Sequence, residues 1–335
     1  MKLLFIGPLQ SSFVKNDIKI LSEQHQLVFE DAAIGRGIKG LINLGLGTLR
    51  SIFRVLSSDG VFCWFADYTT LVPAVVGRLL GKKVFVIAGG FDVTYLPEIN
   101  CGAWVRPMRR FCVSKTFSHA TKIFPVSLYA ENQLKRLTQG NHAPSTMIYN
   151  CIDSQKFVEA ADYTSKRDII LTVSQADNRT EYIRKGSDLF INAAKENPKY
   201  KFVLAGLRGE ALELAKVDAA GIANIDIVPG PLSLYEELIP YYNRAIAYCQ
   251  FSIEETFGVA PLEAMICGAL PIVSRGGALP EVAGDKGKVV SNFDDLSDVF
   301  HFANNMTEEQ RGELKTHAIK FDISVRKKML MAEVK

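Results

Sequence analysis

The sequence lacks the residue patterns of most metal and redox sites. Its six cysteines form no Cys-x-x-Cys pair and stand at no spacing to the five histidines that suggests zinc, so we expect reduced core residues. No Asp-x-Asp occurs in the chain. The first expected strand is followed by Gly7, Pro8 and Leu9 rather than by Gly-x-Gly-x-x-Gly. These absences disfavour a zinc protein and a dinucleotide-dependent dehydrogenase.

Long hydrophobic runs are also missing from the start of the chain. The opening residues, MKLLFIGPLQSS, hold a four-residue apolar run that Gly7 and Pro8 interrupt. That run is too short for the core of a signal peptide or for a membrane span, so we expect a cytoplasmic protein. The apolar fraction of 48% and the charged fraction of 22% are typical of a globular chain, and 335 residues favour two domains over one.

Acidic residues are scarce in the first half. Residues 1–150 hold 17 Lys and Arg against 9 Asp and Glu, a net charge of +8, whereas the remainder holds 22 against 27, a net charge of −5. A basic half attracts an anionic partner such as acidic lipid or nucleic acid, although a solvated basic face is the alternative. No nucleic-acid-binding module is recognisable, so we expect no nucleic-acid partner.

Two segments of the basic half combine cations with apolar residues. The first, residues 39–55, mixes Gly and Leu with Lys39, Arg50 and Arg54. The second contains Trp104, Arg106, Arg109, Arg110, Phe111 and Lys115. Helices of this kind bind peripherally to anionic membranes on the cytoplasmic face. The alternative is a packed helix with an exposed basic rim, and both interpretations stay open.

Apolar runs rich in Val, Ile and Phe alternate with segments at helical spacing, which predicts α/β domains with doubly wound parallel sheets. The expected strands are residues 3–6, 27–29, 61–65, 83–88, 122–126 and 146–149, then 168–174, 201–206, 225–230, 245–249 and 270–274. The polar stretch 153–167 has no apolar period and predicts a linker. We therefore expect two facing Rossmann-like domains, at 1–155 and 165–306, and a C-terminal helix at 307–335 that returns to the first domain.

The residues most typical of a binding or catalytic site follow the expected strand at 245–249. The chain there reads EETFGVAPLEAMICG, and we expect a short helix at 261–267. Gly258 and Val259 offer no side-chain oxygen to cap the free amides of this helix, so these amides suit a phosphate, with water as the alternative cap. Glu263 lies in an apolar helix, and a buried carboxylate there needs hydroxyl or cationic partners. The other possibility is a solvated glutamate of a first helical turn.

The second half resembles the GT-B glycosyltransferases, and within them the large retaining family 4. The matching residues are Ser252-Ile253-Glu254-Glu255-Thr256-Phe257-Gly258, Leu262-Glu263-Ala264-Met265, Cys267-Gly268-Ala269-Leu270-Pro271-Ile272-Val273, Gly276-Gly277 and Pro280-Glu281-Val282. The resemblance implies that Glu255 meets the hydroxyls of the donor sugar and that Glu263 binds the ribose of the nucleotide. It also places Phe257, Gly258 and Val259 beside the donor.

Fixed cations are expected to neutralise the leaving diphosphate, because no Asp-x-Asp is present to hold a metal. Similar proteins use a Gly-Arg followed by a Lys-Gly after the first strand of the second domain. Lys185-Gly186 matches the Lys-Gly, whereas Gln175 stands where the Arg is expected. Arg184 is the favoured substitute and Arg179 the other candidate. Solvated loop cations are the alternative.

The first domain resembles the family more loosely. Residues 89–92 resemble a His-Gly-Ser-Asp stretch near the acceptor, with Gly89 in place of His, and residues 7–13 replace a Gly-Gly loop. The resemblance implies that Gly90, Asp92 and Ser12 lie on the acceptor side. In the second domain, the loop 229–233 with Gly230 is the candidate site for the nucleotide base.

These residues together predict a retaining, metal-independent glycosyltransferase without a cofactor. It would move a sugar from a UDP- or GDP-sugar to a hydroxyl acceptor on a lipid, glycan or small molecule. Two alternative functions stay open: a GT-B epimerase or hydrolase of sugar nucleotides, and a non-catalytic sugar-nucleotide-binding subunit.

Overall fold

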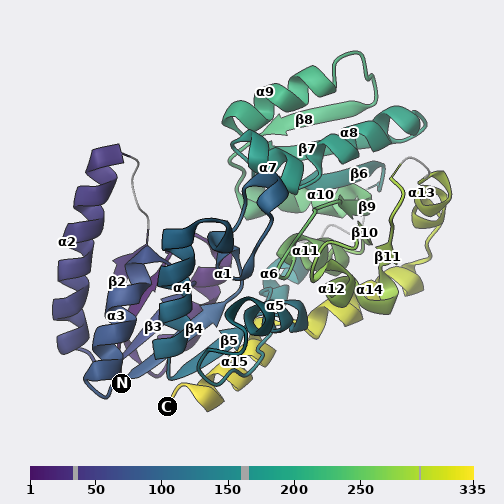
Figure 1. Cartoon of the computed structure of the whole chain (residues 1–335). Coiled ribbons are helices and arrows are strands. Elements are labelled where there is room, and N and C mark those ends of the chain that lie inside the picture. The colour runs from purple at the N-terminus through teal and green to yellow at the C-terminus, as the bar shows by residue number, and fades with distance from the viewer. Residues whose placement is uncertain (33–36, 160–165, 294–295) are drawn as a thin grey trace. The chain divides into compact units, whose positions relative to one another are not determined.

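The chain forms two compact α/β units (Figure 1). The computed structural model describes residues 1–32, 37–159, 166–293 and 296–335. The first unit comprises Met1–Cys151 together with Ile323–Lys335, and the second comprises Ile152–Asp322. Part of the linker expected at 153–167 forms a helix, and residues 160–165 lie outside the described residues.

The first unit is built on a five-stranded parallel sheet with the order β2-β1-β3-β4-β5. Its strands are β1 (Lys2–Gly7), β2 (Gln26–Asp31), β3 (Gly60–Trp64), β4 (Lys83–Ala88) and β5 (Lys122–Pro125). The central strands are continuous apolar runs because both faces of a parallel sheet are covered by helices. Leu3, Leu4, Phe5 and Ile6 of β1 accordingly have no exposed surface.

Helices cover both faces of this sheet. They are α1 (Ser12–Leu21), α2 (Gly37–Leu56), α3 (Tyr68–Leu79), α4 (Pro107–His119), α5 (Leu128–Thr138) and α15 (Ile323–Glu333), with short turns η1 (Phe91–Val93), η2 (Pro97–Ile99) and η3 (Ala103–Val105). Right-handed crossovers place α2, α3 and α4 side by side on one face and α1 on the other, beside α15.

A buried ion pair attaches α15 to the first unit. The guanidinium of Arg326 donates to both carboxylate oxygens of Asp17 in α1, at 2.6 Å each. Trp64 donates its indole N–H to Asp17 Oδ2 at 2.7 Å, and Arg326 also donates to the carbonyl oxygens of Ile148 and Tyr149. Both charges are fully enclosed, so this pair fixes where the last helix packs.

The second unit contains a six-stranded parallel sheet with the order β11-β10-β9-β6-β7-β8. Its strands are β6 (Ile169–Val173), β7 (Lys201–Leu207), β8 (Ile225–Pro229), β9 (Ala245–Gln250), β10 (Leu270–Val273) and β11 (Lys288–Val289). The chain runs outward from β6 to β8 and then returns to place β9 on the other side of β6. The sheet therefore has its topological switch point between β6 and β9, where doubly wound sheets bind ligands.

The helices of the second unit follow the same alternation. They are α6 (Ser154–Glu159), α7 (Arg179–Arg184), α8 (Ser187–Glu196), α9 (Gly209–Asp218), η4 (Leu234–Leu238), α10 (Ile239–Arg244), α11 (Val259–Ile266), α12 (Leu279–Ala283), η5 (Gly284–Lys286), α13 (Ser297–Asn304) and α14 (Glu308–Ile319). None of the helices in the described part of the chain is long and apolar enough to cross a bilayer.

The structure differs from the sequence expectations at three places. Residues 146–149 run beside β5 and donate backbone hydrogen bonds to Ile123 and Pro125, but they form no strand, and the preceding Ser145 makes only an isolated bridge to Ile123. The segment 307–335 is two helices, of which only α15 belongs to the first unit. Arg311 explains why α14 stays with the second unit, because its guanidinium is buried on the carbonyl oxygens of Gly268 and Ala303. The expected loop before Lys185 contains α7.

Candidate active site

The candidate site lies at the carboxyl edge of the sheet in the second unit. Each strand near the switch point is followed there by a polar or glycine-containing loop. These loops supply Gln175 after β6, Arg208 after β7, Gly230 after β8, Ser252 and Glu255 after β9, and Ser274 after β10. Parallel strands end at the same edge, so residues distant in sequence meet there.

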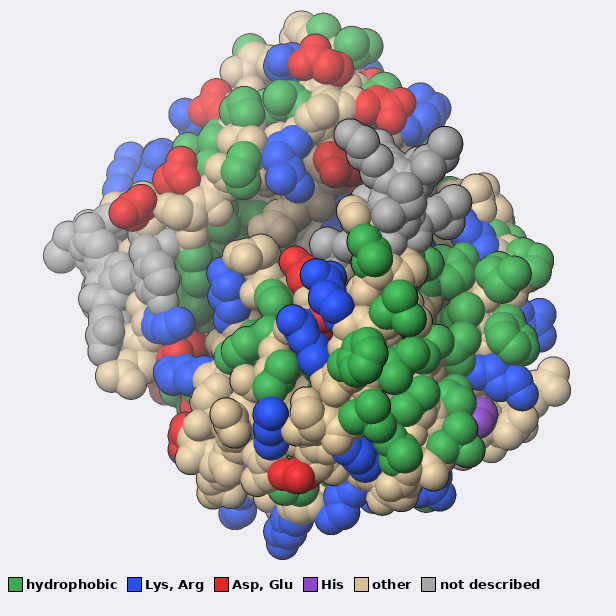
Figure 2. Space-filling view, turned by 90° about the vertical axis from the view of Figure 1, so that its left-hand side faces the viewer, with side chains coloured by type: hydrophobic (Ala, Val, Ile, Leu, Met, Phe, Trp, Pro, Cys, Tyr) green, Lys and Arg blue, Asp and Glu red, His purple; other side chains and the backbone are tan. Residues whose placement is uncertain are grey.

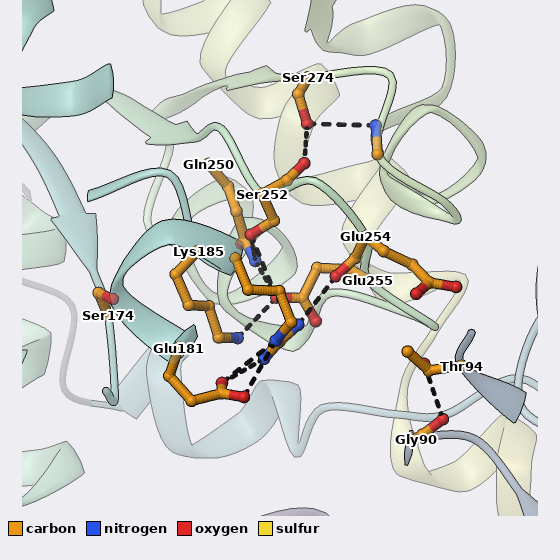
Figure 3. A network of polar contacts seen from close by, with 12 residues as sticks. Gly90, Thr94, Ser174, Glu181, Lys185, Gln250, Ser252, Glu254, Glu255 and Ser274 are labelled. Carbon is orange, nitrogen blue, oxygen red and sulfur yellow. Dashed lines mark hydrogen bonds and ion pairs between the residues drawn. The ribbon is translucent and has the colours of Figure 1, made fainter. Parts of the chain in front are cut away.

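Glu255 is the centre of a network of polar contacts (Figure 3). Its Oε1 atom accepts hydrogen bonds from Lys185 Nζ at 2.6 Å, Gln250 Nε2 at 3.0 Å and Ser252 Oγ at 3.2 Å. Arg184 Nη1 lies 3.7 Å from the same oxygen. The side chain of Glu255 remains 14% exposed, so the network reaches the surface of the unit.

The charges around Glu255 keep it ionised. Burial opposes ionisation of the carboxyl group, but the positive charges of Lys185 and Arg184 and the hydrogen bonds from Lys185 and Ser252 outweigh burial and lower its pKa to about 2. A carboxylate with this pKa does not donate a proton near neutral pH. Glu255 can therefore accept hydrogen bonds and stabilise positive charge, and it cannot act as a general acid.

Gly186 brings Lys185 to the end of β9. It has a φ of +67°, and a Cβ at this position would lie 2.3 Å from the carbonyl oxygen of Phe251. Only glycine permits both that φ and that approach. The amide of Ile253 also donates to the carbonyl oxygen of Arg184 at 2.8 Å. The backbone geometry therefore explains why glycine follows Lys185 in the motif.

A second glycine holds Glu255 from the other side. Gly277 has a φ of +65°, and a Cβ there would lie 2.2 Å from the carbonyl oxygen of Glu255. The amide of Ala278 donates to that same oxygen at 2.8 Å. Ser274 adds a bond from its hydroxyl to the carbonyl oxygen of Ser252 at 2.6 Å. The backbone that carries Glu255 is consequently clamped between the loops after β6 and β10.

The structure brings one of the two candidate arginines to Glu255. Arg184, the last residue of α7, donates to the backbone oxygen of Glu254 and to the carboxylate of Glu181. Arg179 is exposed at the first position of the same helix, and its backbone amide is bonded to Glu210. The helical turn between them directs the two side chains differently, and the geometry favours Arg184.

Glu254, the glutamate that precedes Glu255, points in a different direction. Its side chain is buried, and Figure 3 shows it directed away from Lys185. The Glu254 contribution to the network is its carbonyl oxygen, which accepts from Arg184 Nη1 at 2.9 Å. Geometry and the eight-residue spacing before Glu263 therefore favour the same glutamate.

Glu263 has the hydroxyl partner that its apolar helix requires. Tyr242 of α10 donates its hydroxyl to Glu263 Oε2 at 2.8 Å. Burial raises the pKa of Glu263 to about 7, and the bond from Tyr242 opposes this rise. The negative charges of Glu263 and Glu255 both contribute to the raised pKa of Tyr248, whose main cause is burial. The two glutamates thus lie in different environments. Glu255 is fully ionised at neutral pH, whereas Glu263 titrates near neutral pH.

The remaining donor-side residues occupy different positions around α11. Gly258 is the N-cap of this helix and Val259 its first residue, so both lie at the amide-bearing end. Phe257 instead packs in the core, 3% exposed, with its ring centroid 5.7 Å from that of Phe321. The ring therefore supports the loop before α11, and the place of Phe257 beside the donor stays a prediction.

Gly230 lies where β7 and β8 end. Its amide donates to the carbonyl oxygen of Leu207 at 2.9 Å, and the loop that follows lines a cavity of about 70 Å³. Gln175 and Arg208 line the same cavity. The cavity thus combines an apolar loop with the cation of Arg208.

The acceptor-side residues belong to the first unit. Ser12 begins α1 after β1, and Gly90 and Asp92 follow β4. Asp92 is fully buried, and its carboxylate accepts from the backbone amides of Ala66, Gly89 and Gly90. Burial raises its pKa to about 7, against the effect of these amides. The carboxylate of Asp92 therefore holds the loop at Gly89 and Gly90, and the acceptor-side place of Ser12, Gly90 and Asp92 stays a prediction.

Sequence reasoning missed several members of the site. They are Glu181, Arg208, Tyr242 and Gln250. Gln250 is a polar residue at the end of a buried apolar strand, and Arg208 follows a strand in the same way, so both carried a usable signal. Tyr242 gave no signal in the sequence, because its distance from Glu263 depends on how α10 packs.

Solved structures share this architecture over the whole chain. The HepE protein of Anabaena, in complex with UDP and glucose, aligns with a TM-score of 0.78 at 12% identity and covers 100% of this chain and 99% of its own. A glycosyltransferase from Rickettsia africae aligns with a TM-score of 0.74 at 14% identity, covering 99% and 97%. Two parallel-sheet domains of this kind are the GT-B fold of glycosyltransferases, and the chain has that fold.

The sequence comparisons find similar glycosyltransferases as well. The family model described as "Glycosyl transferases group 1" matches residues 155–310, which contain the whole Glu255 network. This match covers 156 of the 335 residues, so the second unit resembles this glycosyltransferase family. The serotype-specific mannosyltransferase WbdA of Escherichia coli is 27% identical over 232 residues, which are 63% of this chain and 28% of WbdA. A second WbdA sequence is 30% identical over 146 residues, 41% of this chain and 18% of the relative. The chain thus spans less than a third of the length of these relatives.

Proposed function

We propose that the chain transfers a hexose from a nucleoside diphosphate sugar to a hydroxyl acceptor, with retention of anomeric configuration and without a metal ion. The observation that carries this proposal is the ionised carboxylate of Glu255 held by Lys185 and Arg184 at the switch point of the sheet. Polysaccharide biosynthesis is the proposed setting, because the E. coli relatives are serotype-specific mannosyltransferases.

Glu255 is proposed to receive the hydroxyls of the donor sugar. An anion with a pKa of about 2 accepts hydrogen bonds strongly and stays charged as positive charge develops on the sugar ring. Retention is proposed from the family 4 motif, with the acceptor hydroxyl attacking on the face from which the diphosphate departs.

Lys185 and Arg184 are proposed to take the diphosphate. Both cations are at least 17% exposed, so a phosphate can reach them while they remain bonded to Glu255. The Coulomb attraction between a cation and a unit negative charge about 4 Å away is up to about 4 kcal/mol at an effective dielectric constant of about 20. Two such cations supply the charge that a metal ion supplies in other transferases, which is why metal independence is proposed.

Glu263 is proposed to bind the ribose hydroxyls. Tyr242 occupies one oxygen, and the side chain is only partly covered by protein, so a diol can approach the carboxylate. The uncapped amides at Gly258 and Val259 favour the diphosphate at the same helix end. The loop at Gly230 is the proposed place of the base.

A panel of donors tests the proposal. The protein is incubated with EDTA and with UDP-glucose, GDP-mannose and related UDP- and GDP-sugars, each with glycan, lipid-phosphate and small hydroxyl acceptors. A new glycoside, found by mass spectrometry and absent with Glu255→Gln, is the expected result. Free sugar without glycoside would indicate a hydrolase, an epimerised donor an epimerase, and tight donor binding without any product a binding subunit. Each of these three outcomes would overturn the proposed transfer.

A further inference from the structure

One face of the first unit contains no acidic residue in its helices. α2, α3 and α4 lie side by side on the same face of the sheet, and their sequences contain no Asp or Glu. They contain seven cations, which are Lys39, Arg50, Arg54, Arg78, Arg109, Arg110 and Lys115. The helices α1, α5 and α15 of the same unit each carry at least one acidic residue. We refer to the outer side of α2, α3 and α4 as the acid-free face.

Large apolar side chains are exposed on this face. On α2, Leu46, Leu49, Phe53 and Leu56 recur at intervals of three and four residues and form one stripe. Phe53 is 71% exposed, and Leu79 at the end of α3 is 79% exposed. Met108 and Phe111 continue the set on α4 at 67% and 53%. Figure 2 shows hydrophobic side chains gathered over a broad area of this side, with Lys and Arg beside them.

Some cations of this face are paired with carboxylates, and among them Arg50 keeps a side chain that is 64% exposed. Arg50 and Arg54 both contact Glu30 of β2, and Arg109 forms a two-bond pair with Asp67. Arg106, Arg110 and Lys115 remain exposed beside Met108 and Phe111. Trp104 is buried and Arg109 is paired with Asp67, so neither belongs to the exposed basic set that the sequence indicated.

A cavity lies at the α4 end of the acid-free face. Its volume is about 530 Å³, and Tyr95, Trp104, Arg110, Phe111 and Lys115 line it. Arg110 Cζ lies 5.6 Å from the ring centroid of Trp104, and Lys115 Nζ lies 6.0 Å from that of Phe111. Cations held beside aromatic rings can bind an anionic headgroup while the rings contact its apolar part.

We propose that the acid-free face binds the surface of an anionic lipid bilayer. Cations alone would suit nucleic acid, but the exposed Phe53, Leu79, Met108 and Phe111 would then stay in water. An anionic bilayer covers both kinds of side chain, because apolar tips enter the headgroup region while cations contact the phosphates. Charge complementarity and the apolar stripe thus point to the same occupant. Vesicle binding needs no donor sugar, so this proposal can fail without affecting the proposed transfer.

Vesicle co-sedimentation tests the charge component. The full chain is mixed with vesicles of equimolar phosphatidylglycerol and phosphatidylcholine, or of phosphatidylcholine alone, at low salt and at high salt. Binding to the anionic vesicles only, weakened by salt, is expected. The pair Arg110→Gln and Lys115→Gln should weaken binding about 25-fold, at about fivefold per cation. The matched pair Lys195→Gln and Lys199→Gln, exposed in the second unit, should change binding less than twofold.

A second pair of variants tests the apolar component. Phe53→Ser should weaken vesicle binding at least about tenfold. Val217→Ser is the control, because Val217 is 72% exposed on α9 of the second unit and so matches Phe53 in exposure. Absence of binding at low salt, equal binding to neutral vesicles, or equal losses in test and control variants would overturn the proposal. Sedimentation velocity tests whether a second copy of this chain occupies the face instead. A dimer that Phe53→Ser dissociates, together with no vesicle binding, would mean that the face joins two copies of this chain.

Discussion

Replacing Lys185 with alanine removes the closest cation from Glu255. Its Nζ lies 2.6 Å from Glu255 Oε1 and contributes the largest effect that lowers the pKa of that carboxyl group. Without Lys185, burial acts against the remaining charge of Arg184 at 3.7 Å, and the pKa of Glu255 rises. The variant also loses one fixed charge for the leaving diphosphate. Loss of one group that stabilises charge in the transition state raises the activation free energy by about 2.7–4 kcal/mol, so kcat should fall about 10²- to 10³-fold.

The assay is the rate of glycoside formation as a function of pH. The wild-type enzyme should keep an ionised Glu255 throughout the range from pH 5 to pH 8, because its pKa is about 2. Lys185→Ala should lose additional activity toward acidic pH, as the raised pKa of Glu255 allows protonation. Lys195→Ala, at an exposed position of α8, is the control and should stay within about twofold of wild type. Lys185→Ala with activity within tenfold of wild type and an unchanged pH profile would refute this reasoning.

Three further predictions follow from the same contacts. Glu255→Gln should abolish transfer but bind UDP or GDP at least as tightly as wild type, because Lys185 keeps its charge. Calorimetry measures this binding, and loss of nucleotide binding in the variant would contradict the prediction. The affinity for an intact UDP- or GDP-sugar should fall as the pH drops through about 7, by up to about tenfold per unit, since protonation of Glu263 removes the negative charge that makes it a strong acceptor for the ribose hydroxyls. This pH dependence should vanish in Glu263→Gln, and a flat wild-type profile would exclude the role of Glu263. Arg326→Met should lower the free energy of unfolding by about 3–5 kcal/mol, because Asp17 would stay buried without its cation; an unchanged urea midpoint would show that the pair does not stabilise the first unit.

The sequence predicted the two sheets well because buried parallel strands are continuous apolar runs. The strand expected at 83–88 has the same limits as β4, and those at 201–206 and 245–249 each extend by one residue. Residues 146–149 have the composition of a strand but follow Pro144 at the edge of the sheet, where only scattered hydrogen bonds to β5 form. Composition does not distinguish an edge segment from a strand, because pairing depends on the neighbouring chain.

The candidate site was predictable where the chain resembles a known motif, and that resemblance is what indicated Lys185 and Glu255. The structure adds the reason for the glycines of the motif, because Gly186 and Gly277 permit close backbone approaches beside these two residues. The choice between Arg184 and Arg179 was not settled by spacing, because it depends on α7, a helix of six residues that the sequence did not reveal. The position of α14 depends on Arg311, a buried cation whose partners are carbonyl oxygens, and backbone partners leave no pattern in a sequence.

The anomeric configuration of the product tests the central proposal most directly. A ¹³C-labelled donor selected from the panel is converted in the presence of EDTA, and the coupling constant of the new glycosidic bond is measured by NMR. Retained configuration is the result that the resemblance to family 4 predicts, and transfer without metal that is lost in Glu255→Gln is the result that a Glu255 carboxylate held by fixed cations predicts. An inverted product, or transfer that requires a divalent cation, would contradict it.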